Sequence, residues 1–295
     1  MNKAACVILN YKDAKNTAAL AEIALGYPSI GKVFVVDNCS PDDSLRELNQ
    51  LKERGVSVIA SDKNNGYGAG NNIGVAAARD EGYRFALIAN PDVKFTDECI
   101  SKLVAAMEQG SGIGVSSAIQ KDQHGCVVDL AAWKIPTAAQ LAAASSGLLS
   151  RIVGRPLYET SYLHSSSTVE VDCVPGAMLM VNTDCFERVG GYDEDIFLYC
   201  EETVLGIRMK RAGFKTLLIT EESYQHLHKQ NESGASDSRS QLRDRIFSSR
   251  KLIMEKYYRS STALRLFQTF AFQLSRLEDT FACCLSRPKR SVGND

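Results

Sequence analysis

The sequence predicts an α/β protein with a mostly parallel central sheet, followed by a helical C-terminal extension. Short apolar, β-branched runs alternate with helical patterns through the first 120 residues, as in consecutive β-α-β units. The runs at residues 33–36 and 86–88 contain no polar position, which is typical of parallel strands buried on both faces. Beyond residue 238 the pattern is helical to about Leu285.

The individual elements follow from local patterns. We expect strands at residues 5–9, 33–37, 56–60, 85–89 and 113–117, and helices at residues 14–25, 44–54, 70–81 and 96–109. The pattern weakens between residues 120 and 170, where we expect loops. It returns as strands at residues 169–173, 177–181 and 216–219 and a helix at 203–212. The Ser-, Gly- and Asn-rich segment 231–238 marks a boundary, so we predict one domain over residues 1–235 and a helical, basic extension over residues 236–295.

The composition is that of an ordinary soluble globular protein, with 44% hydrophobic and 23% charged residues. The apolar run at the start is too short for a secretory signal peptide, and no stretch reaches the roughly 18 apolar residues of a membrane span. We therefore expect a cytoplasmic protein whose membrane contact, if present, is peripheral and on the inner face of the cell membrane. Nine cysteines without a C-x-x-C pair suit reduced thiols better than disulfides or a zinc site.

The net charge of −1 conceals a strong asymmetry. Residues 239–290 contain 12 Lys and Arg against four Asp and Glu, a net charge of +8. A basic helical tail suits an anionic membrane surface or an acidic partner. A solvated helix face packed on the main domain, or an element of a homodimer, explains the same pattern. No nucleic-acid partner is expected.

Polar residues follow the first two predicted strands, where a parallel sheet binds its ligands. Asn10 and Tyr11 end the first strand, and Asp37 and Asn38 end the second. An Asp in this position accepts hydrogen bonds from a ribose hydroxyl or a base N–H. The following segment, residues 40–43, supplies a turn and a helix cap, so capping alone is the alternative for Asp37.

A glycine-rich segment follows the third predicted strand. Residues 64–72 include Asn65, Gly66, Gly70 and Asn71 and lead into a helix, whose N-terminus favours an anion. Such turns are common, so this signal is weak alone. The segment lacks the position and spacing of the G-x-G-x-x-G dinucleotide fingerprint, and the chain has no G-x-x-x-x-G-K-[ST] phosphate loop. A nicotinamide oxidoreductase and a P-loop enzyme are therefore disfavoured.

Further along the chain, carboxylates and histidines take positions that suit a metal or a general base. Asn90 and Asp92 follow the fourth strand, where a carboxylate can hold a cation that bridges a diphosphate, or simply form a turn. Gly176 precedes an apolar strand. Glu201 and Glu202 begin a helix and either complement its dipole or act as a base for an acceptor hydroxyl. A histidine near residue 226 can complete a metal site, although a surface histidine is commoner.

These motifs, in this order along residues 4–230, resemble glycosyltransferase family two and, within it, bacterial rhamnosyltransferase-like enzymes of surface polysaccharide (O-antigen or capsule) synthesis. In chain order the motifs are Asn10-Tyr11, Asp37-Asn38, Asn64-Asn65-Gly66, Asn90-Pro91-Asp92, Pro175-Gly176, Gly190-Gly191-Tyr192-Asp193, Glu201-Glu202 and His226. The ordered series is much more specific than any one motif.

The resemblance implies a GT-A fold, a UDP- or dTDP-sugar donor, a saccharide or lipid-linked acceptor, and Mg²⁺ or Mn²⁺. It assigns Asp37 and the segment 64–72 to the nucleotide, Asp92 to the last acid of the family's Asp-x-Asp metal motif, and Glu202 to the catalytic base. It also assigns His226 to the metal, with His228 as the alternative because the register there is ambiguous. Single displacement would invert the anomeric centre, and rhamnose is the sugar that the subgroup suggests.

The sequence departs from the family pattern at three positions. Asn90 stands where the metal motif begins with an acid, Glu202 replaces the usual Asp and is one methylene longer, and Val204 stands where the family has its next acid. These departures keep open a non-catalytic paralogue that binds a sugar nucleotide. A nucleotidyltransferase is less favoured, because it would need a basic, glycine-rich loop where residues 10–13 stand.

Overall fold

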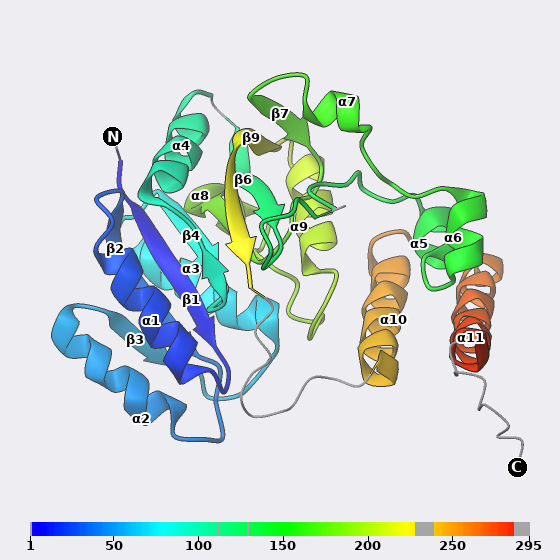
Figure 1. The fold of residues 1–295 in the computed structure, drawn as a ribbon, viewed down its shortest axis with the longest axis horizontal. Helices are drawn as coiled ribbons and strands as arrows, with labels where there is room; N and C mark the ends of the chain where they lie inside the picture. The colour runs from blue at the N-terminus through cyan, green and yellow to red at the C-terminus, as the bar shows by residue number, and fades with distance from the viewer. Residues whose placement is uncertain (1, 111, 129, 228–238, 286–295) are drawn as a thin grey trace, which may run out of the picture. The chain divides into compact units, whose positions relative to one another are not determined.

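A mixed sheet of nine strands lies at the centre of the larger part of the chain (Figure 1). The computed structural model describes residues 2–110, 112–128, 130–227 and 239–285. It divides into two units: Met1–Ile135 with Leu157–Ser238, and Pro136–Pro156 with Arg239–Asp295. The sheet belongs to the first unit. Its strands are β1 (Ala4–Asn10), β2 (Ile30–Asp37), β3 (Ser57–Ala60), β4 (Phe85–Ala89), β5 (Val93–Lys94), β6 (Ile113–Lys121), β7 (Thr168–Val171), β8 (Met178–Asn182) and β9 (Lys215–His226).

The strand order is β3-β2-β1-β4-β8-β6-β9-β5, and β7 also pairs with β9. Strands β3, β2, β1 and β4 are parallel, as are β6 and β9. Strand β8 runs antiparallel to both β4 and β6, and the short strands β5 and β7 run antiparallel to β9. The predicted α/β class is confirmed, with β8 inserted in the opposite direction between the two parallel groups.

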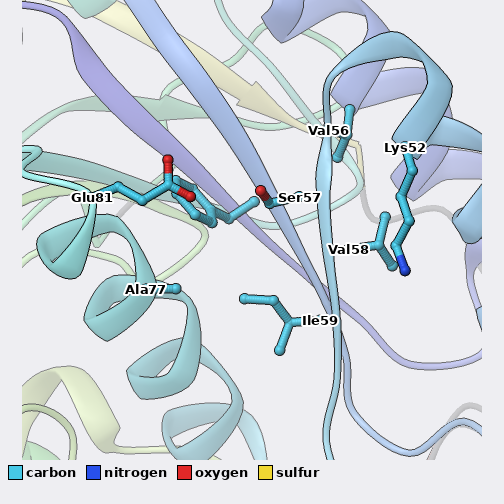
Figure 2. Close-up of a pocket in the computed structure, with 8 residues that line it drawn as sticks. Lys52, Val56, Ser57, Val58, Ile59, Ala77 and Glu81 are labelled. Atoms are coloured by element: carbon cyan, nitrogen blue, oxygen red, sulfur yellow. The ribbon is translucent and has the colours of Figure 1, made fainter.

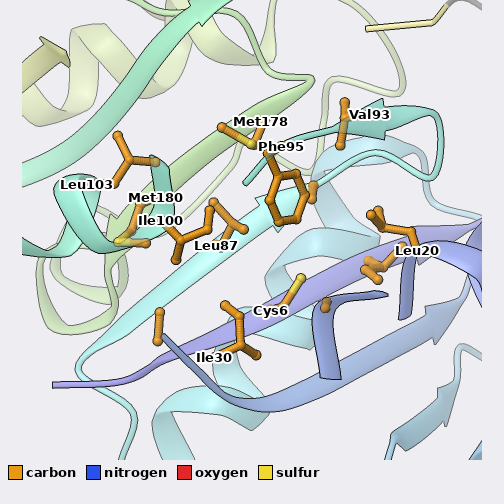
Figure 3. Close-up of a cluster of buried hydrophobic side chains, with 14 of the residues drawn as sticks. Cys6, Leu20, Ile30, Leu87, Val93, Phe95, Ile100, Leu103, Met178 and Met180 are labelled. Carbon is orange, nitrogen blue, oxygen red and sulfur yellow. The ribbon is translucent and has the colours of Figure 1, made fainter. Parts of the chain in front are cut away.

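Helices cover both faces of this sheet. The helices of the first unit are α1 (Ala14–Leu25), α2 (Ser44–Leu48), the 3-10 helix η1 (Asn49–Arg54), α3 (Tyr67–Asp80), α4 (Asp97–Glu108), α7 (Thr160–Leu163), α8 (Thr183–Arg188) and α9 (Glu201–Arg211). Alternate side chains of β1 enter two apolar cores: Cys6 and Ile8 pack with α1 and α4, and Ala5 and Val7 pack with α3, α8 and α9. Figure 3 shows the first of these cores.

Several boundaries differ from the sequence-based expectation. The predicted helix over 44–54 is an α-helix only to Leu48 and continues as the 3-10 helix η1. Helix α3 begins at Tyr67, three residues before its predicted start at Gly70. Strand β9 runs on to His226, well past its predicted end, because it pairs with β6 and β5 beyond Ile219. His226 therefore ends a strand and does not follow one.

The second unit contains four helices among the described residues: α5 (Ala138–Ala143), α6 (Gly147–Val153), α10 (Arg239–Lys256) and α11 (Thr262–Leu285). Helix α5 begins with a capping box between Thr137 and Gln140, a local signal that the sequence analysis missed when it assigned this region to loops. Helices α10 and α11 confirm the expected helical extension. The extension also takes in Pro136–Pro156, which we did not expect, and its status as a separate domain remains a prediction.

Contacts within and between its two sequence segments hold the second unit together. The Phe247 and Phe272 rings stack with centroids 4.0 Å apart. The Glu278 carboxylate of α11 accepts hydrogen bonds from Ser146 Oγ at 2.6 Å and from the N–H groups of Gly147 at 2.8 Å and Leu148 at 3.2 Å. A carboxylate at the N-terminus of α6 also complements the helix dipole.

Candidate functional site

The candidate site residues gather at one edge of the sheet because of how the strands run. Strands β1, β2 and β4 are parallel, so Asn10, Asp37 and Asn90 lie at their common carboxyl edge. Strand β8 is antiparallel to β4 and pairs Met178 with Ala89, which brings the turn before β8 to the same edge. The Asn90 N–H donates to the Ala177 carbonyl there at 2.9 Å.

Asn10 and Asp37 form a buried polar pair at this edge. Their side chains are 0% and 1% exposed, and Asn10 Nδ2 donates to Asp37 Oδ1 at 2.7 Å. The Ser40 N–H donates to the other Asp37 oxygen at 3.0 Å, and Asn10 Oδ1 accepts from the Thr17 hydroxyl at 2.9 Å. Asp37 thus caps the turn after β2, which is the alternative role that the sequence offered for it. Each carboxylate oxygen has two lone pairs, so Asp37 retains acceptor capacity for a ligand. Tyr11, beside this pair, is 42% exposed.

The segment after β3 is held by hydrogen bonds from the Asn38 side chain and by close packing against the Phe197 backbone. Asn38 Nδ2 donates to the Asn64 side chain at 3.0 Å and to the Gly66 carbonyl at 3.1 Å. Gly66 has φ of +95°, and a Cβ there would lie 2.0 Å from the Phe197 carbonyl oxygen. Only glycine fits this position, because both the backbone conformation and the space exclude a side chain. Asn65, next to it, is half-buried.

Gly70 and Asn71 lie inside α3, which begins at Tyr67 and not at Gly70 as predicted. A Cβ on Gly70 would lie 2.3 Å from a methyl group of Leu9, so the glycine makes room for β1. Asn71 is fully buried and its Nδ2 donates to the Tyr67 carbonyl at 3.0 Å. Close packing of helix on strand accounts for this glycine, and its contact with a ligand remains only a prediction.

Asp92 and His226, the two predicted metal ligands, lie together. His226 Nε2 is 3.2 Å from Asp92 Oδ1, and the backbone pairs β5 with the end of β9, Val93 opposite His226. Gln120 Nε2 lies 3.4 Å from His226 Nδ1, and the Tyr224 hydroxyl donates to Gln120 Oε1 at 2.9 Å. This chain of contacts orients the imidazole ring, as outer partners do for metal-binding histidines.

The donor set at Asp92 and His226 suits a divalent cation. A carboxylate oxygen and an imidazole nitrogen are both ligand types for Mn²⁺, and Mg²⁺ is commonly held by one or two carboxylates with phosphate oxygens completing its shell. The described residues contain no group of three or more His, Cys, Asp or Glu that would hold a metal without such added ligands. His228, the alternative ligand, lies outside the described residues.

Glu202 contacts the turn before β8. The Gly176 N–H donates to Glu202 Oε1 at 3.1 Å, and a Cβ on Gly176 would lie 2.3 Å from the same oxygen. The Gly176 carbonyl accepts a hydrogen bond from the Tyr67 hydroxyl at 2.7 Å. Burial, followed by the nearby Glu202 and Glu201 carboxylates, raises the pKa of Tyr67 well above its ordinary value, so the hydroxyl stays a donor. Tyr67, Gly176 and Glu202 therefore form one connected unit.

The adjacent glutamates are both poorly solvated. Glu201 is 2% exposed, and its Oε1 has no hydrogen-bond partner. Burial, and then the Glu202 charge, raise the pKa of Glu201 to about 8. Burial also raises the pKa of Glu202, although the Gly176 N–H opposes this. A carboxyl with a raised pKa is a stronger base once ionised, which suits proton abstraction.

The backbone just before these glutamates is unusual. Tyr199 and Cys200 have φ of +72° and +71°, a conformation that non-glycine residues rarely adopt and that concentrates at functional sites. The start of α9 is thus fixed by a strained turn. Val204, where the resemblance places a further acid, is fully buried in the apolar core and has no role in the site.

A surface hollow of about 360 Å³ lies apart from these residues (Figure 2). It is formed at the edge strand β3 and is lined by Phe34, Lys52, Val56, Ser57, Val58, Ile59, Ala77 and Glu81. None of the candidate site residues lines it.

Three residues of the site were missed by the sequence analysis: Tyr67, Gln120 and Tyr224. Gln120 was overlooked because the predicted strand stopped at residue 117. Tyr224 and His226 are two positions apart, so they lie on the same face of β9, and this alternation was a usable signal once the strand was extended. Tyr67 gives no sequence signal, because its partner Gly176 lies 109 residues away.

Comparison with known proteins agrees with the motifs. The model of the glycosyl transferase family 2 matches residues 11–169, more than half of the chain. The chain is 27% identical over 230 residues to the N-acetylglucosaminyl-diphospho-decaprenol L-rhamnosyltransferase of Mycobacterium tuberculosis (strain CDC 1551 / Oshkosh), covering 73% of this chain and 72% of the relative.

Solved structures share the fold at low sequence identity. GalNAc-T7 with UDP, GalNAc and Mn²⁺ matches with a TM-score of 0.62 and 13% identity, over 98% of this chain and 58% of that protein. The mannosyltransferase PcManGT from Pyrobaculum calidifontis, in complex with GDP-Man and Mn²⁺, matches with a TM-score of 0.58 and 11% identity, over 97% and 76%. The expected GT-A fold is confirmed, and the chain belongs to glycosyl transferase family 2.

Proposed function

We propose that this protein is an inverting glycosyltransferase that moves a sugar from a nucleotide-diphospho-sugar to a hydroxyl of a saccharide or lipid-linked acceptor. The observation that carries the proposal is the gathering of distant residues at one sheet edge, where Asp92 and His226 lie 3.2 Å apart. Asn10 with Asp37, and Gly176 with Glu202, stand at the same edge. These pairs correspond to a nucleotide contact, a metal site and a base.

The donor is assigned to the side of the site formed by Asn10 and Asp37. The buried Asp37 carboxylate is held by Asn10 and by the Ser40 N–H, so its remaining lone pairs are fixed in direction and suit a ribose hydroxyl or a base N–H. We infer a UDP- or dTDP-sugar. Rhamnose is the sugar named in the M. tuberculosis relative, and it is the first candidate here.

Asp92 and His226 are the residues that would hold Mg²⁺ or Mn²⁺. The cation would neutralise the charge that develops on the departing diphosphate. The two similar structures, GalNAc-T7 and PcManGT, contain Mn²⁺, which supports a divalent ion in this fold. Gln120 fixes the ring of His226 from its other nitrogen.

Glu202 is assigned as the general base. Its Oε1 is held by the Gly176 N–H, which leaves Oε2 to accept the acceptor's proton. The acceptor oxygen then forms a bond to the anomeric carbon while the bond from that carbon to the diphosphate breaks, and the nucleoside diphosphate leaves with the electron pair. One displacement inverts the anomeric centre, and no covalent enzyme intermediate is needed.

The acceptor is inferred from the relative's name, which specifies a sugar on a diphospho-polyprenol. We propose a lipid-linked acceptor of surface polysaccharide synthesis, reached from the cytoplasmic face of the membrane. A lipid-linked acceptor would bring the enzyme to the membrane surface.

The test replaces Glu202 with Gln, which keeps the shape of the side chain and removes its basicity. Loss of a general base costs about 10²–10⁴-fold in rate, so transfer should fall by that factor. Donor binding should be unchanged, measured as the rise in melting temperature with UDP-, dTDP- and GDP-sugars in the presence of Mn²⁺. Asp92→Asn is the counterpart, expected to remove the metal-dependent part of that rise. Full turnover by the Glu202→Gln variant would contradict the assignment of the base.

A non-catalytic sugar-nucleotide-binding protein is the second candidate. The buried Val204 and the neutral Asn90 favour it, because each replaces an acid of the family pattern. It predicts donor binding by the wild-type protein without transfer to any lipid-linked or saccharide acceptor, and without donor hydrolysis.

A further inference from the structure

Helix α11 turns a row of large apolar side chains to solvent. Leu266, Phe270 and Leu277 are 66%, 57% and 56% exposed. Their spacings of four and seven residues place them on one side of the helix. We call these three residues the outer face of α11. The opposite side is buried and includes Gln268, Ala271, Phe272 and Ser275, so the helix already has a packed side.

Helix α6 adds two more exposed apolar side chains in the same unit. Leu148 is 56% exposed and Ile152 is 72% exposed, and they are one helical turn apart. The Leu148 N–H donates to Glu278, the residue directly after Leu277. The start of α6 therefore lies against the turn of α11 that carries Leu277.

Basic residues flank both apolar groups. The exposed Arg265 and Arg276 lie along one flank of the outer face of α11. At about 100° per residue they are about 100° and 80° from Leu266, both in the same direction around the helix axis. Arg265 is 3.9 Å from Glu255. On α6, exposed Arg151 precedes Ile152. Long arginine side chains can lie along an apolar surface while their charged heads reach polar groups.

We propose that the outer face of α11, together with Leu148 and Ile152, binds an anionic phospholipid surface, with the helices lying in the plane of the headgroups. A large apolar face with a positively charged flank is the pattern of an interfacial helix. The net charge of +8 over residues 239–290 complements anionic lipid and opposes pairing of this face with a second copy of itself. No helix among the described residues is long and apolar enough to span a membrane. This membrane-binding surface is additional to the proposed transferase activity. Only its purpose, which is to bring the enzyme to a lipid-linked acceptor, rests on the proposed function.

The test measures co-flotation of the full-length protein with vesicles. Phosphatidylcholine vesicles with and without phosphatidylglycerol are compared, at low and high salt. The wild-type protein should bind the anionic vesicles, and salt should weaken the binding. The double substitution Leu266→Ser with Phe270→Ser should weaken it by about tenfold for each side chain. Ile23→Ser is the matched control, because Ile23 is 52% exposed on α1 of the other unit, and it should bind as wild type does.

A second variant separates charge from apolar contact. Arg265→Glu with Arg276→Glu should weaken binding to anionic vesicles by at least about fivefold per residue and reduce its salt dependence, because the net charge of residues 239–290 falls from +8 but stays positive. Equal flotation of wild type and the Leu266→Ser, Phe270→Ser variant would overturn the proposal. So would a stable dimer of the wild type that dissociates in this variant, because a second copy would then cover the face. Melting-temperature shifts with nucleotide sugars do not involve this face, so they report separately on the proposed function.

Discussion

Replacing Glu201 with Gln should make the protein more stable near neutral pH and leave it unchanged in acid. Glu201 is 2% exposed, one of its carboxylate oxygens has no partner, and the residue beside it is another glutamate. Burial and then the Glu202 charge raise its pKa from 4.5 to about 8. Glutamine has nearly the same shape and cannot ionise, so the unfolded chain of the variant gains no stability from losing a proton at this position.

The pH dependence of the stability follows from how the Glu201 carboxyl group is protonated in the folded and in the unfolded chain. Below pH 4.5 the Glu201 carboxyl group is protonated in both the folded and the unfolded chain. Its contribution to the free energy of unfolding is then fully present. As the pH rises towards 8, the unfolded chain releases a proton that the folded chain keeps, and stability is lost at about 1.4 kcal/mol per pH unit. At pH 7 the loss amounts to about 3 kcal/mol. The glutamine variant should not show it.

The assay is thermal unfolding of both proteins between pH 4.5 and 8. For a chain of this size about 1 kcal/mol moves the melting temperature by roughly 2–4 °C, so Glu201→Gln should melt about 6–12 °C higher at pH 7 and alike at pH 4.5. Glu53→Gln is the control, because Glu53 is exposed on η1. Parallel pH curves for wild type and Glu201→Gln would show that Glu201 is ionised in the folded protein at neutral pH, and the reasoning would fail.

Three further substitutions test other contacts. Gly74→Ala should lower the free energy of unfolding by about 1–3 kcal/mol in denaturant titrations, because its Cβ would lie 2.3 Å from Val7 in the core; wild-type stability would contradict the tight packing of α3 on β1. Gly176→Ala should displace Glu202 and reduce transfer about tenfold or more while donor-induced melting shifts persist; undiminished turnover would show that Glu202 need not keep this position. Burial raises the pKa of Glu278, but its hydrogen bonds to Ser146, Gly147 and Leu148 outweigh this and lower the pKa below its ordinary value. Glu278→Gln should therefore reduce the free energy of unfolding by about 1 kcal/mol above pH 4.5 and by progressively less as the pH falls. A reduction that does not change with pH would indicate that the carboxylate charge is unimportant.

The sequence was most informative where apolar runs end in polar residues. The strands ending at Asn10, Asp37 and Ala89 were predicted within one residue at their carboxyl ends, because buried parallel strands leave continuous apolar runs. Once those ends are known, the parallel arrangement brings Asn10 and Asp37 together without further information. This part of the site could therefore be derived from local pattern and topology.

Other parts of the site depend on contacts between distant residues. Strand β9 extends to His226 only because β6 and β5 pair with it, and residues 220–226 include too many polar side chains to read as a buried strand. The first turn of α3 reads as a glycine-rich turn before a helix, since nothing local shows that Leu9 lies against Gly70. Helices α5 and α6 were missed because their stability comes from α10 and α11, whose sequences begin more than 80 residues later.

The divided origin of the second unit has a consequence for synthesis. Its first segment, Pro136–Pro156, leaves the ribosome before Arg239 and the helices that cover it have been made. At translation rates of about 5–20 residues per second, roughly 80 intervening residues take about 4–16 s. During that interval the buried Leu141, Ala142 and Ala143 of α5 lack the cover of α10 and α11, so we expect the nascent chain to be most open to chaperones and proteases at this stage.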